Sequence, residues 1–330
     1  MRYGIFAAIV AFCWVFGALG QSRLAPPPPA GGTLVKVTSA ADLQARLQAV
    51  ANVGGAIMFD PTTPVDVPDT IVVTLKDVGE FGPQFYFNGL VLNGTMRDGA
   101  KSVIRFAGKT RNMVIADLNI WGNRYATPGA KNGFELEAVD GDIWYFTLRR
   151  LAVSYTGADC INIKGSVFEG SIDQPITKDC WGNAMTIDGT PGVGGVPRVP
   201  SNIRITSADL SRSHGYGLEL INANSVDLMS GSFILNGKGG VKSPRGIRYA
   251  GPINGENTGP ALFDFTGLSP TEYPTTIMGA NLSSDGKTYV GPPSRYLIMA
   301  PAVHPTIHLM TGYCTPYGTM PTMAVWAPVP

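Results

Sequence analysis

Two segments of this chain, Asp159-Cys160-Ile161-Asn162-Ile163 and Asn183-Ala184-Met185-Thr186-Ile187, show the same pattern of residue types. Each starts with a polar residue, continues with a small one and ends in an apolar–polar–apolar triplet. Two further segments fit this pattern, Asn132 to Leu136 and Tyr216 to Leu220, and a weaker copy starts at Gly239. The four full copies start at 132, 159, 183 and 216, which are 27, 24 and 33 residues apart. Similar segments at intervals of roughly 20 to 50 residues are typical of repeat proteins.

A second class of short apolar strand precedes the copies, so each repeat contains several strands joined by turns. Its members are Val114-Ile115, Phe146-Thr147-Leu148, Ile203-Arg204-Ile205 and Val226-Asp227-Leu228. A coil of three short strands and their turns takes roughly 22 to 25 residues, which matches the spacing. We therefore predict an all-β fold, a single-stranded right-handed parallel β-helix. A β-sandwich with accidental similarity between its strands is the alternative.

Stacked coils place like residues above like, so the alignment of the copies predicts columns of side chains. Two apolar columns are predicted to point inward, Phe134/Ile161/Met185/Leu218 and Leu136/Ile163/Ile187/Leu220. Two polar columns are predicted to point outward, Glu135/Asn162/Thr186/Glu219 and Glu137/Lys164/Asp188.

The segment before the repeats reads as a cap over the first open end of the β-helix. Residues 35–37 form a short strand, and Ser39 starts a helix, with Asp42 three residues on in nearly a capping-box arrangement. An apolar stripe follows at Leu43, Leu47 and Val50. Gly54 and Gly55 end the helix. Repeat proteins need such caps, because an end coil otherwise exposes its core.

The chain divides into four segments. Residues 1–20 read as a signal peptide, with an uncleaved anchor helix as the alternative. Residues 21–33 form a Pro-rich linker, and residues 34–250 form the β-helix domain with its cap. The repeat fades in residues 251–330, which form either irregular last coils or a tail packed along the helix.

The composition excludes several classes of partner. The chain has 330 residues, of which 44% are hydrophobic and 15% charged, and a net charge of +1. It shows no basic stripe, so nucleic acid is not an expected partner. It contains no second apolar stretch long enough to span a membrane after signal cleavage. We expect a secreted or periplasmic protein, and the sequence leaves its oligomeric state open.

Three cysteines remain after signal cleavage, Cys160, Cys180 and Cys314, so at most one internal disulfide can form. Cys180 aligns with Thr156 and Ser213 rather than with the column of Cys160. This alignment places the two thiols several strand residues apart, beyond the Cα separation that a disulfide tolerates. We predict that Cys160 and Cys180 are not bonded to each other.

The turns before the aligned segments bring polar and aromatic residues together. The alignment predicts three turn columns, Tyr155/Asp179/Arg212, Thr156/Cys180/Ser213 and Gly157/Trp181/His214. Because coils stack about 4.8 Å apart, neighbours in a column are within reach of one another. The candidate catalytic residues are Asp159, Asp179, His214 and Arg212. The candidate substrate-binding residues are Trp181, Tyr155, Tyr216, Lys164, Asp188 and Glu219. Aspartates in such turns also cap backbone N–H groups, which is the structural alternative for Asp159.

The cap and the coils, over residues 34–59 and 85–245, resemble the pectin-lyase-like β-helix superfamily. Gly157-Ala158-Asp159-Cys160 is similar to the Gly-Asp-Asp-Cys segment of polygalacturonases, with alanine in place of one aspartate. Ser213-His214-Gly215 is similar to their His-Gly segment, although it lies two coils away rather than one. The resemblance implies a scaffold that handles polysaccharide.

We expect a polysaccharide-active protein, with a lyase acting on an acidic glycan ahead of a glycoside hydrolase. No cofactor is required, but Asp159 and Asp179 are candidate ligands for Ca²⁺. A lyase also needs a base near the C5 proton, for which the candidates are Arg212, Lys164 and His214. A hydrolase needs two carboxyls flanking the bond, and Asp159 with Asp179 or Asp188 could serve.

Two other classes of function remain open at this stage. The protein could be a non-catalytic glycan-binding β-helix, such as a surface adhesin or a virion or tail component. It could also be a structural spacer that needs no binding site.

Overall fold

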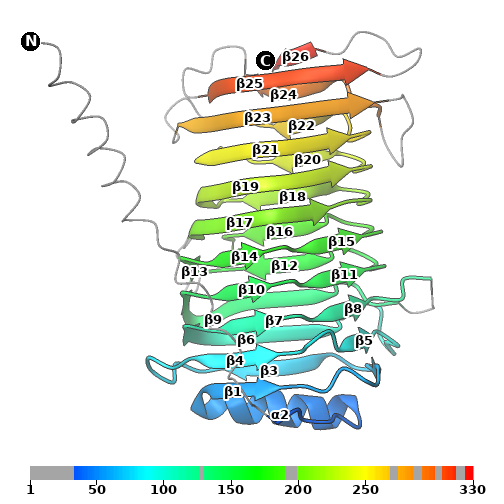
Figure 1. Ribbon diagram of the computed structural model, residues 1–330, viewed down its shortest axis with the longest axis vertical. Coiled ribbons are helices and arrows are strands. Elements are labelled where there is room, and N and C mark those ends of the chain that lie inside the picture. The colour runs from blue at the N-terminus through cyan, green and yellow to red at the C-terminus, as the bar shows by residue number, and fades with distance from the viewer. Residues whose placement is uncertain are drawn as a thin grey trace, which may run out of the picture. The chain divides into compact units, whose positions relative to one another are not determined.

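The computed structural model describes residues 33–125, 129–190, 199–267, 274–284, 292–301, 307–316 and 324–329. Its strands pair in parallel as one 26-stranded sheet wound around a common axis. Figure 1 shows the coils stacked from the helix α2 to the strand β26. This confirms the predicted single-stranded right-handed parallel β-helix with an N-terminal capping helix. The predicted signal peptide and residues 21–32 of the predicted linker lie outside the described residues. Within the described residues, no helix has the length and apolar character needed to span a membrane.

Each coil contributes strands to three faces, named A, B and C here. Face A consists of β3 (Ile71–Leu75), β6 (Ile104–Arg111), β9 (Phe134–Trp144), β12 (Ile161–Lys164), β16 (Met185–Asp188), β18 (Tyr216–Ile221), β20 (Gly239–Lys242), β22 (Ala261–Asp264), β24 (Tyr296–Pro301) and β26 (Ala324–Val329). Face B starts with β1 (Gly55–Met58), β4 (Pro83–Tyr86), β7 (Val114–Ala116), β10 (Thr147–Arg149) and β14 (Ser171–Asp173). Face C starts with β2 (Val65–Asp66), β5 (Val91–Asn93), β8 (Asn119–Trp121), β11 (Ala152–Ser154) and β15 (Ile176–Lys178).

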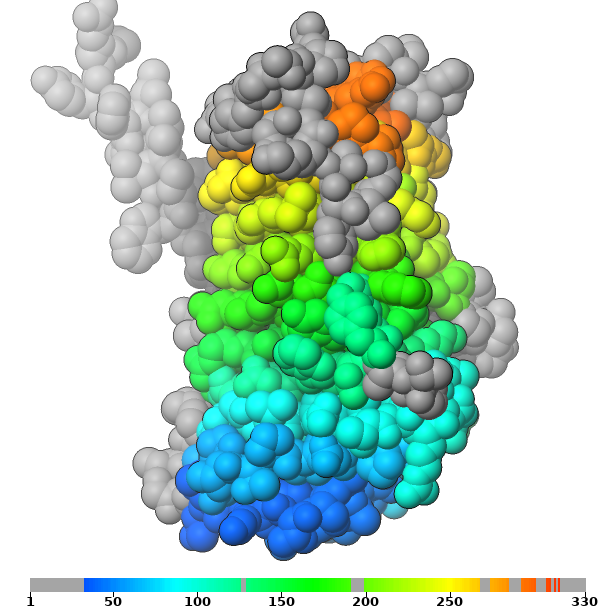
Figure 2. All heavy atoms as spheres, turned by 90° about the vertical axis from the view of Figure 1, so that its right-hand side faces the viewer, coloured from blue at the N-terminus to red at the C-terminus, as the bar shows by residue number. Residues whose placement is uncertain are grey.

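Later coils join faces B and C through long strands that bend around the corner. These are β17 (Ser201–Leu210), β19 (Asn224–Ile234), β21 (Tyr249–Glu256), β23 (Thr275–Ser284) and β25 (Ile307–Pro316). The short strand β13 (Val167–Phe168) pairs with the end of β9 and the start of β17. Seen from the side, the coils form a continuous wall above the cap (Figure 2).

The register on face A matches the predicted columns. Ile161 lies between Phe134 and Met185, and Met185 pairs with Leu218. All four of these side chains are fully buried. The outward positions follow the same register, with Asn162 between Glu135 and Thr186. The similarity of the segments therefore arises from stacking, as predicted.

Rings and branched side chains fill the interior along the axis. Phe85 lies on face B, and Phe106 and Phe134 lie on face A in neighbouring coils. The ring centroids of Phe85 and Phe106 are 5.4 Å apart, and those of Phe106 and Phe134 are 5.8 Å apart. All three rings are fully buried. Rings from different faces and coils thus meet in one continuous apolar core.

The helix α2 (Ala40–Val53) closes the first coil, at the base of the stack in Figure 1. The Ser39 hydroxyl accepts a hydrogen bond from the Asp42 backbone N–H, as the sequence predicts. Leu43, Leu47 and Ala51 are buried against the core, and Val50 is only half-buried. The cap therefore buries positions i, i+4 and i+8 of the helix.

Two glutamines of α2 also pair with the free edge of β3. Gln48 accepts from the Thr74 N–H at 2.8 Å and donates to the Thr74 carbonyl at 2.9 Å. Gln44, one helical turn earlier, accepts from the Val72 N–H at 3.2 Å. Residues four apart on a helix and two apart on a strand are separated by similar distances, about 6 to 7 Å. The glutamine side chains therefore take the place of a neighbouring strand.

The coils continue through the described part of the last 80 residues. The strands β21, β23 and β25 pair in register, and so do β22, β24 and β26. The described part of residues 251–330 thus consists of further coils, which is the first of the two predicted alternatives. The register of β23 against β25 shifts at two points, between Ile277 and Met278 and between Met278 and Ala280.

Substitution of Gln48 by alanine should leave the backbone N–H and the backbone carbonyl of Thr74 without a protein partner. We expect the free energy of unfolding to fall by about 1 kcal/mol, and self-association to increase because the β3 edge becomes available. Denaturant titration and sedimentation velocity measure the two effects. The control is Val53→Ala on the same helix, whose side chain is 78% exposed. Equal behaviour of the two variants would show that the glutamine does not cap the edge.

Candidate functional site

The predicted turn columns form at the corner where face C leads into face A. Tyr155, Asp179 and Arg212 have φ values of 59°, 59° and 55°, so they occupy the same left-handed position in successive coils. Cys180 forms a parallel backbone β-bridge with Ser213, and the Trp181 N–H donates to the Thr156 carbonyl. The three columns predicted from the alignment are therefore confirmed.

The middle column points into the interior and is mostly polar. Ser213 donates its hydroxyl to Asn236 Oδ1 at 2.8 Å, and Asn236 Nδ2 donates to the Leu210 carbonyl. Thr258, in the next coil, donates to the Phe233 carbonyl at 2.6 Å. These side chains satisfy backbone and side-chain polar groups at the corner, as burial of such groups requires.

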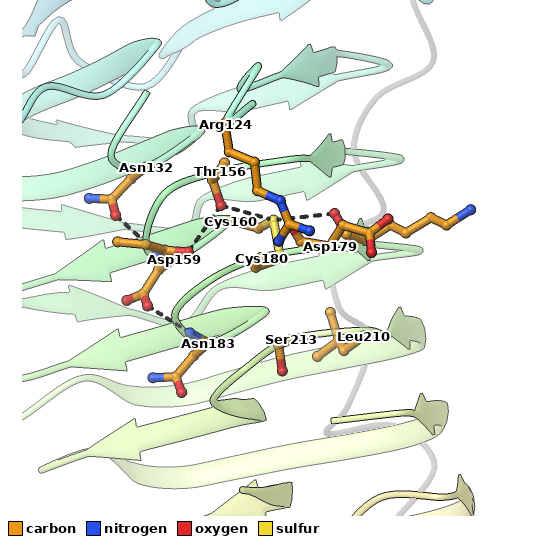
Figure 3. Close-up of a disulfide and its surroundings, with 12 residues drawn as sticks. Arg124, Asn132, Thr156, Asp159, Cys160, Asp179, Cys180, Asn183, Leu210 and Ser213 are labelled. Atoms are coloured by element: carbon orange, nitrogen blue, oxygen red, sulfur yellow. Dashed lines mark hydrogen bonds between the residues drawn. A yellow bond between two sulfur atoms is a disulfide. The ribbon is translucent and has the colours of Figure 1, made fainter. Parts of the chain in front are cut away.

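Cys160 and Cys180 are joined by a disulfide, so the prediction that they are not bonded to each other is wrong. Their Cα atoms are 5.5 Å apart, within the range a disulfide needs. If residues 156–160 were extended strand, the Cα atoms of residues 156 and 160 would be roughly 13 Å apart. The chain bends there, so that the Thr156 hydroxyl lies 3.4 Å from Cys160 Sγ. Residues 156 and 160 therefore face the same interior space. Cys180 lies one coil from Thr156, which brings it within reach of Cys160 (Figure 3).

Exposed aromatic rings gather on the outer side of this corner. We define the aromatic surface by these residues: Trp121, Arg124, Tyr125, Tyr155, Trp181 and His214. The Trp121 and Tyr155 ring centroids are 4.2 Å apart, and those of Trp181 and His214 are 5.5 Å apart. Trp121 is 45% exposed, Tyr125 69% and Trp181 57%. Clusters of exposed aromatic rings are typical of binding surfaces.

Arg124 links the two halves of the aromatic surface. Its guanidinium carbon lies 4.7 Å from the Tyr125 ring centroid and 5.5 Å from that of Trp181. It also donates to the Asp179 carbonyl oxygen at 3.0 Å. Arg124 therefore places a positive charge between two ring faces, a favourable cation–π arrangement.

Sequence analysis did not identify Arg124, Trp121 or Tyr125 as site residues. They lie at the end of β8 and in the segment after it, ahead of the first repeat copy. No aligned segment could therefore place them. The available signal was local, namely two aromatic residues and an arginine within residues 121–125.

His214 is placed to remain neutral near neutral pH. Burial lowers the pKa of its imidazole, the charge of Arg124 lowers it further, and Asp179 acts in the opposite direction. A neutral imidazole can accept a proton. Arg212, another catalytic candidate, lies 3.9 Å from Asp179 Oδ2 through its Nη1 atom. The structure thus brings Asp179, Trp181, Arg212 and His214 together.

Asp159 lies on the other side of the disulfide from Asp179 (Figure 3). It belongs to a ladder in which a side-chain oxygen of one coil accepts the backbone N–H of the next. Asn132 Oδ1 accepts from Asp159, Asp159 Oδ1 from Asn183, and Asn183 Oδ1 from Tyr216. A Cβ added at Gly182 would lie 2.2 Å from Asp159 Oδ1, so glycine is required beside the ladder.

The ladder surrounds the Asp159 carboxylate with neutral donors. Thr186 and Asn162 donate to its Oδ2 at 2.8 and 3.3 Å. Burial raises the pKa of Asp159, although the hydrogen bonds from Asn183 and Thr186 oppose this shift. Asn162 Oδ1 is a buried acceptor without a hydrogen-bond partner among the described residues. A proton on Asp159 would give Asn162 a donor after rotation of its amide.

The remaining substrate-binding candidates lie on face A rather than on the aromatic surface. Tyr216 donates to Asp264 Oδ2 at 2.8 Å, and burial with the neighbouring Asp264 raises the pKa of its phenol strongly. Glu219 accepts from Asn183 at 2.6 Å. Two further candidates have local partners, Lys164 with Glu135 at 3.4 Å and Asp188 with the Thr190 N–H at 2.8 Å.

The two carboxylates expected to hold Ca²⁺ do not form a matching set of ligands. Both oxygens of Asp159 accept from protein donors, and Asp179 faces Arg212. Ca²⁺ takes about six to eight oxygen ligands. In the described ranges, no group of three or more His, Cys, Asp or Glu residues is arranged to hold a metal ion. The mechanism proposed below therefore uses no metal, and calcium binding stays a prediction.

A shallow pocket of about 390 Å³ lies elsewhere, on face A near the cap. Arg105, Lys109 and Asp140 supply its charged walls. Arg105 is already paired with Glu137 at 2.5 Å. Its described lining residues lack the exposed aromatic rings of the aromatic surface.

Comparison with known proteins supports the architecture. No protein-family model and no curated protein sequence matches the chain. The alginate lyase from Paenibacillus sp. str. FPU-7 is similar in structure, with a TM-score of 0.56 and 12% identity over 89% of this chain and 97% of that chain. The enzymatically active domain of bacteriophage CBA120 tailspike protein 2 gives a TM-score of 0.55 and 11% identity over 82% of this chain. This chain spans 40% of that tailspike chain. These are parallel β-helix proteins, so the predicted parallel β-helix architecture is confirmed.

Substitution of Asp159 by asparagine tests whether the fold needs a carboxylate in the ladder. Because its folded pKa is raised, folded Asp159 holds a proton at pH values where the unfolded chain has lost it. Its contribution to stability therefore falls as the pH rises from the ordinary value of 3.8 through the folded value. Asp159→Asn should remove this fall and raise the free energy of unfolding at neutral pH by up to about 1 kcal/mol.

The reverse substitution, Asn183→Asp, is the matched control. It places a carboxylate beside Glu219 and should destabilise the protein by about 1 kcal/mol or more. Urea titrations across the acidic to neutral range measure both variants. A large loss of stability in Asp159→Asn would contradict this description of the ladder.

Proposed function

We propose that the protein binds an acidic polysaccharide on the aromatic surface and acts on it. The observation that carries this proposal is the arrangement of exposed rings around Arg124, with Trp181 and Tyr125 on either side. Flat ring faces suit the apolar faces of sugars, and the cationic groups suit uronate carboxylates. The likeness to an alginate lyase makes alginate, a polyuronate, the first substrate to test.

We propose a lyase ahead of a hydrolase for the same site. A lyase needs a cation at the uronate carboxylate and a base for the C5 proton. Arg124 and Arg212 supply the first, and the imidazole of His214, with its lowered pKa, supplies the second. A hydrolase needs two carboxyls flanking one bond. Asp159 and Asp179 lie on opposite sides of the disulfide, which favours elimination.

The proposed location is outside the cytoplasm, either secreted or periplasmic. A disulfide between two fully buried cysteines supports this proposal, since such bonds form and persist in oxidising compartments. The apolar N-terminal segment agrees with export.

A second candidate function is glycan binding without cleavage, as in an adhesin or a virion or tail component. It is favoured by the hydrogen bonds that already occupy the Asp159 carboxylate. Incubation with alginate and polygalacturonate separates the two functions. Ultraviolet absorbance of an unsaturated product indicates a lyase, new reducing ends without absorbance indicate a hydrolase, and retention alone indicates a binder. Loss of activity in chelator would identify a metal requirement.

Removal of the Trp181 ring should weaken polyuronate binding. We expect Trp181→Ala to raise the dissociation constant for alginate or polygalacturonate roughly tenfold, the effect of losing about 1.4 kcal/mol of ring contact. Affinity electrophoresis and calorimetry measure it. Phe81→Ala is the control, because Phe81 is 79% exposed and lies outside the aromatic surface. The proposal fails if both variants bind like the unmodified protein.

Binding should also depend on pH through His214. Because its pKa lies below the ordinary value of 6.5, acidification within the range where uronates stay ionised adds a positive charge beside Trp181. The affinity for a polyuronate should therefore rise as the pH falls below the ordinary histidine value of 6.5. His214→Gln should give a flat profile. A profile unchanged by this substitution would assign the dependence to another group.

A further inference from the structure

The disulfide occupies the position in the fold that supports the aromatic surface. Cys180 directly precedes Trp181, and the His214 N–H donates to the Cys180 carbonyl at 2.9 Å. The peptide bond to Trp181 and the backbone hydrogen bond from His214 therefore tie both rings, whose centroids lie 5.5 Å apart, to one cross-linked residue. Both cysteines are fully buried.

The neighbouring coils maintain the same corner without a disulfide. One coil further along, the equivalent positions are Ala184 and Ser213, and one coil earlier they are Gly133 and Thr156. Ser213 is linked to the following coil by its hydrogen bonds to Asn236. The corner itself thus folds with small or hydroxyl residues at these positions, and the covalent link is an addition at one level of the stack.

That level is the one where the turn carries a large exposed ring. Trp181 is 57% exposed, and the ring neighbours described for it, Arg124 and His214, are themselves side chains at the surface. A ring with so little packing depends on its backbone for orientation. A rigid corner also lowers the entropy lost when a ligand binds.

We propose that the Cys160–Cys180 disulfide is a positioning element of the polysaccharide-binding surface, holding the Trp181 and His214 rings in contact with each other. This inference rests on the proposed function for its binding readout only. The ring geometry can be measured without any ligand. The two cysteines touch no sugar and act through the turn at residues 179–181.

The sequence of the neighbouring coils supplies the test variants. Cys160→Ala with Cys180→Ser copies the Ala184 and Ser213 pair, and Cys160→Gly with Cys180→Thr copies the Gly133 and Thr156 pair. Thr258→Val is the control, because it removes a cross-coil hydrogen bond, to the Phe233 carbonyl, in the same inward column further along the stack from Trp181 and His214. It separates a general loss of stability from a local loss of ring geometry.

The first readout is the tryptophan fluorescence that disappears on Trp181→Phe substitution. A protonated imidazole quenches a tryptophan it contacts, so acidification should dim this component in the oxidised protein. The dimming should be lost in the cysteine variants, which circular dichroism should still show as β-helical, and kept in Thr258→Val. The second readout is alginate affinity, which should fall roughly tenfold in the cysteine variants only.

Cysteine variants with unchanged dimming and unchanged affinity would overturn the inference and leave the proposed function intact. An oxidised protein that binds no polyuronate would remove the proposed function, and the fluorescence would still decide the inference. If the first pair of substitutions prevents folding, the second pair is measured in its place. Loss of both readouts in Thr258→Val as well would also overturn the inference, since general destabilisation would then explain them.

Discussion

Backbone hydrogen bonding between successive coils is the constraint on which the rest of this structure depends. Each strand donates to and accepts from the strands one coil away, so residues at equal positions lie over one another. An inward position on a face strand must then be apolar in every coil, and an outward position receives the same two neighbours throughout. The core, the columns and the grouping of candidate residues all follow from this register.

The corner between faces C and A is where this constraint is hardest to meet. The chain bends there, and backbone groups that would pair in a straight strand need side-chain partners. The ladder through Asn132, Asp159 and Asn183 supplies acceptors on one side. The inward column supplies hydroxyls and an amide, as at Ser213 and Asn236. Most of the polar residues at the corner are therefore explained by the fold before any function is invoked.

This distinction decides how much the sequence could predict. The columns on face A were predictable, because a repeated apolar–polar–apolar triplet specifies both facing and register. The disulfide was not, because sequence gives distance along the chain and not across a bend such as 156–160. Arg124 was not predictable either, since its segment has no copy to align with. The repeat thus predicts what recurs in every coil, whereas features of a single coil depend on the path of the chain.

A departure from the column is therefore more informative about function than agreement with it. The outer turn column runs through Gly157, Trp181, His214 and Gly237, as the backbone hydrogen bonds show. Glycine at both ends shows that the turn itself needs no side chain there. A tryptophan with 57% of its area in water does little for the core, so the fold gives no reason for it. Residues that depart from the pattern of the fold without stabilising it are expected at functional sites. Trp181, beside Arg124 and His214, is such a residue.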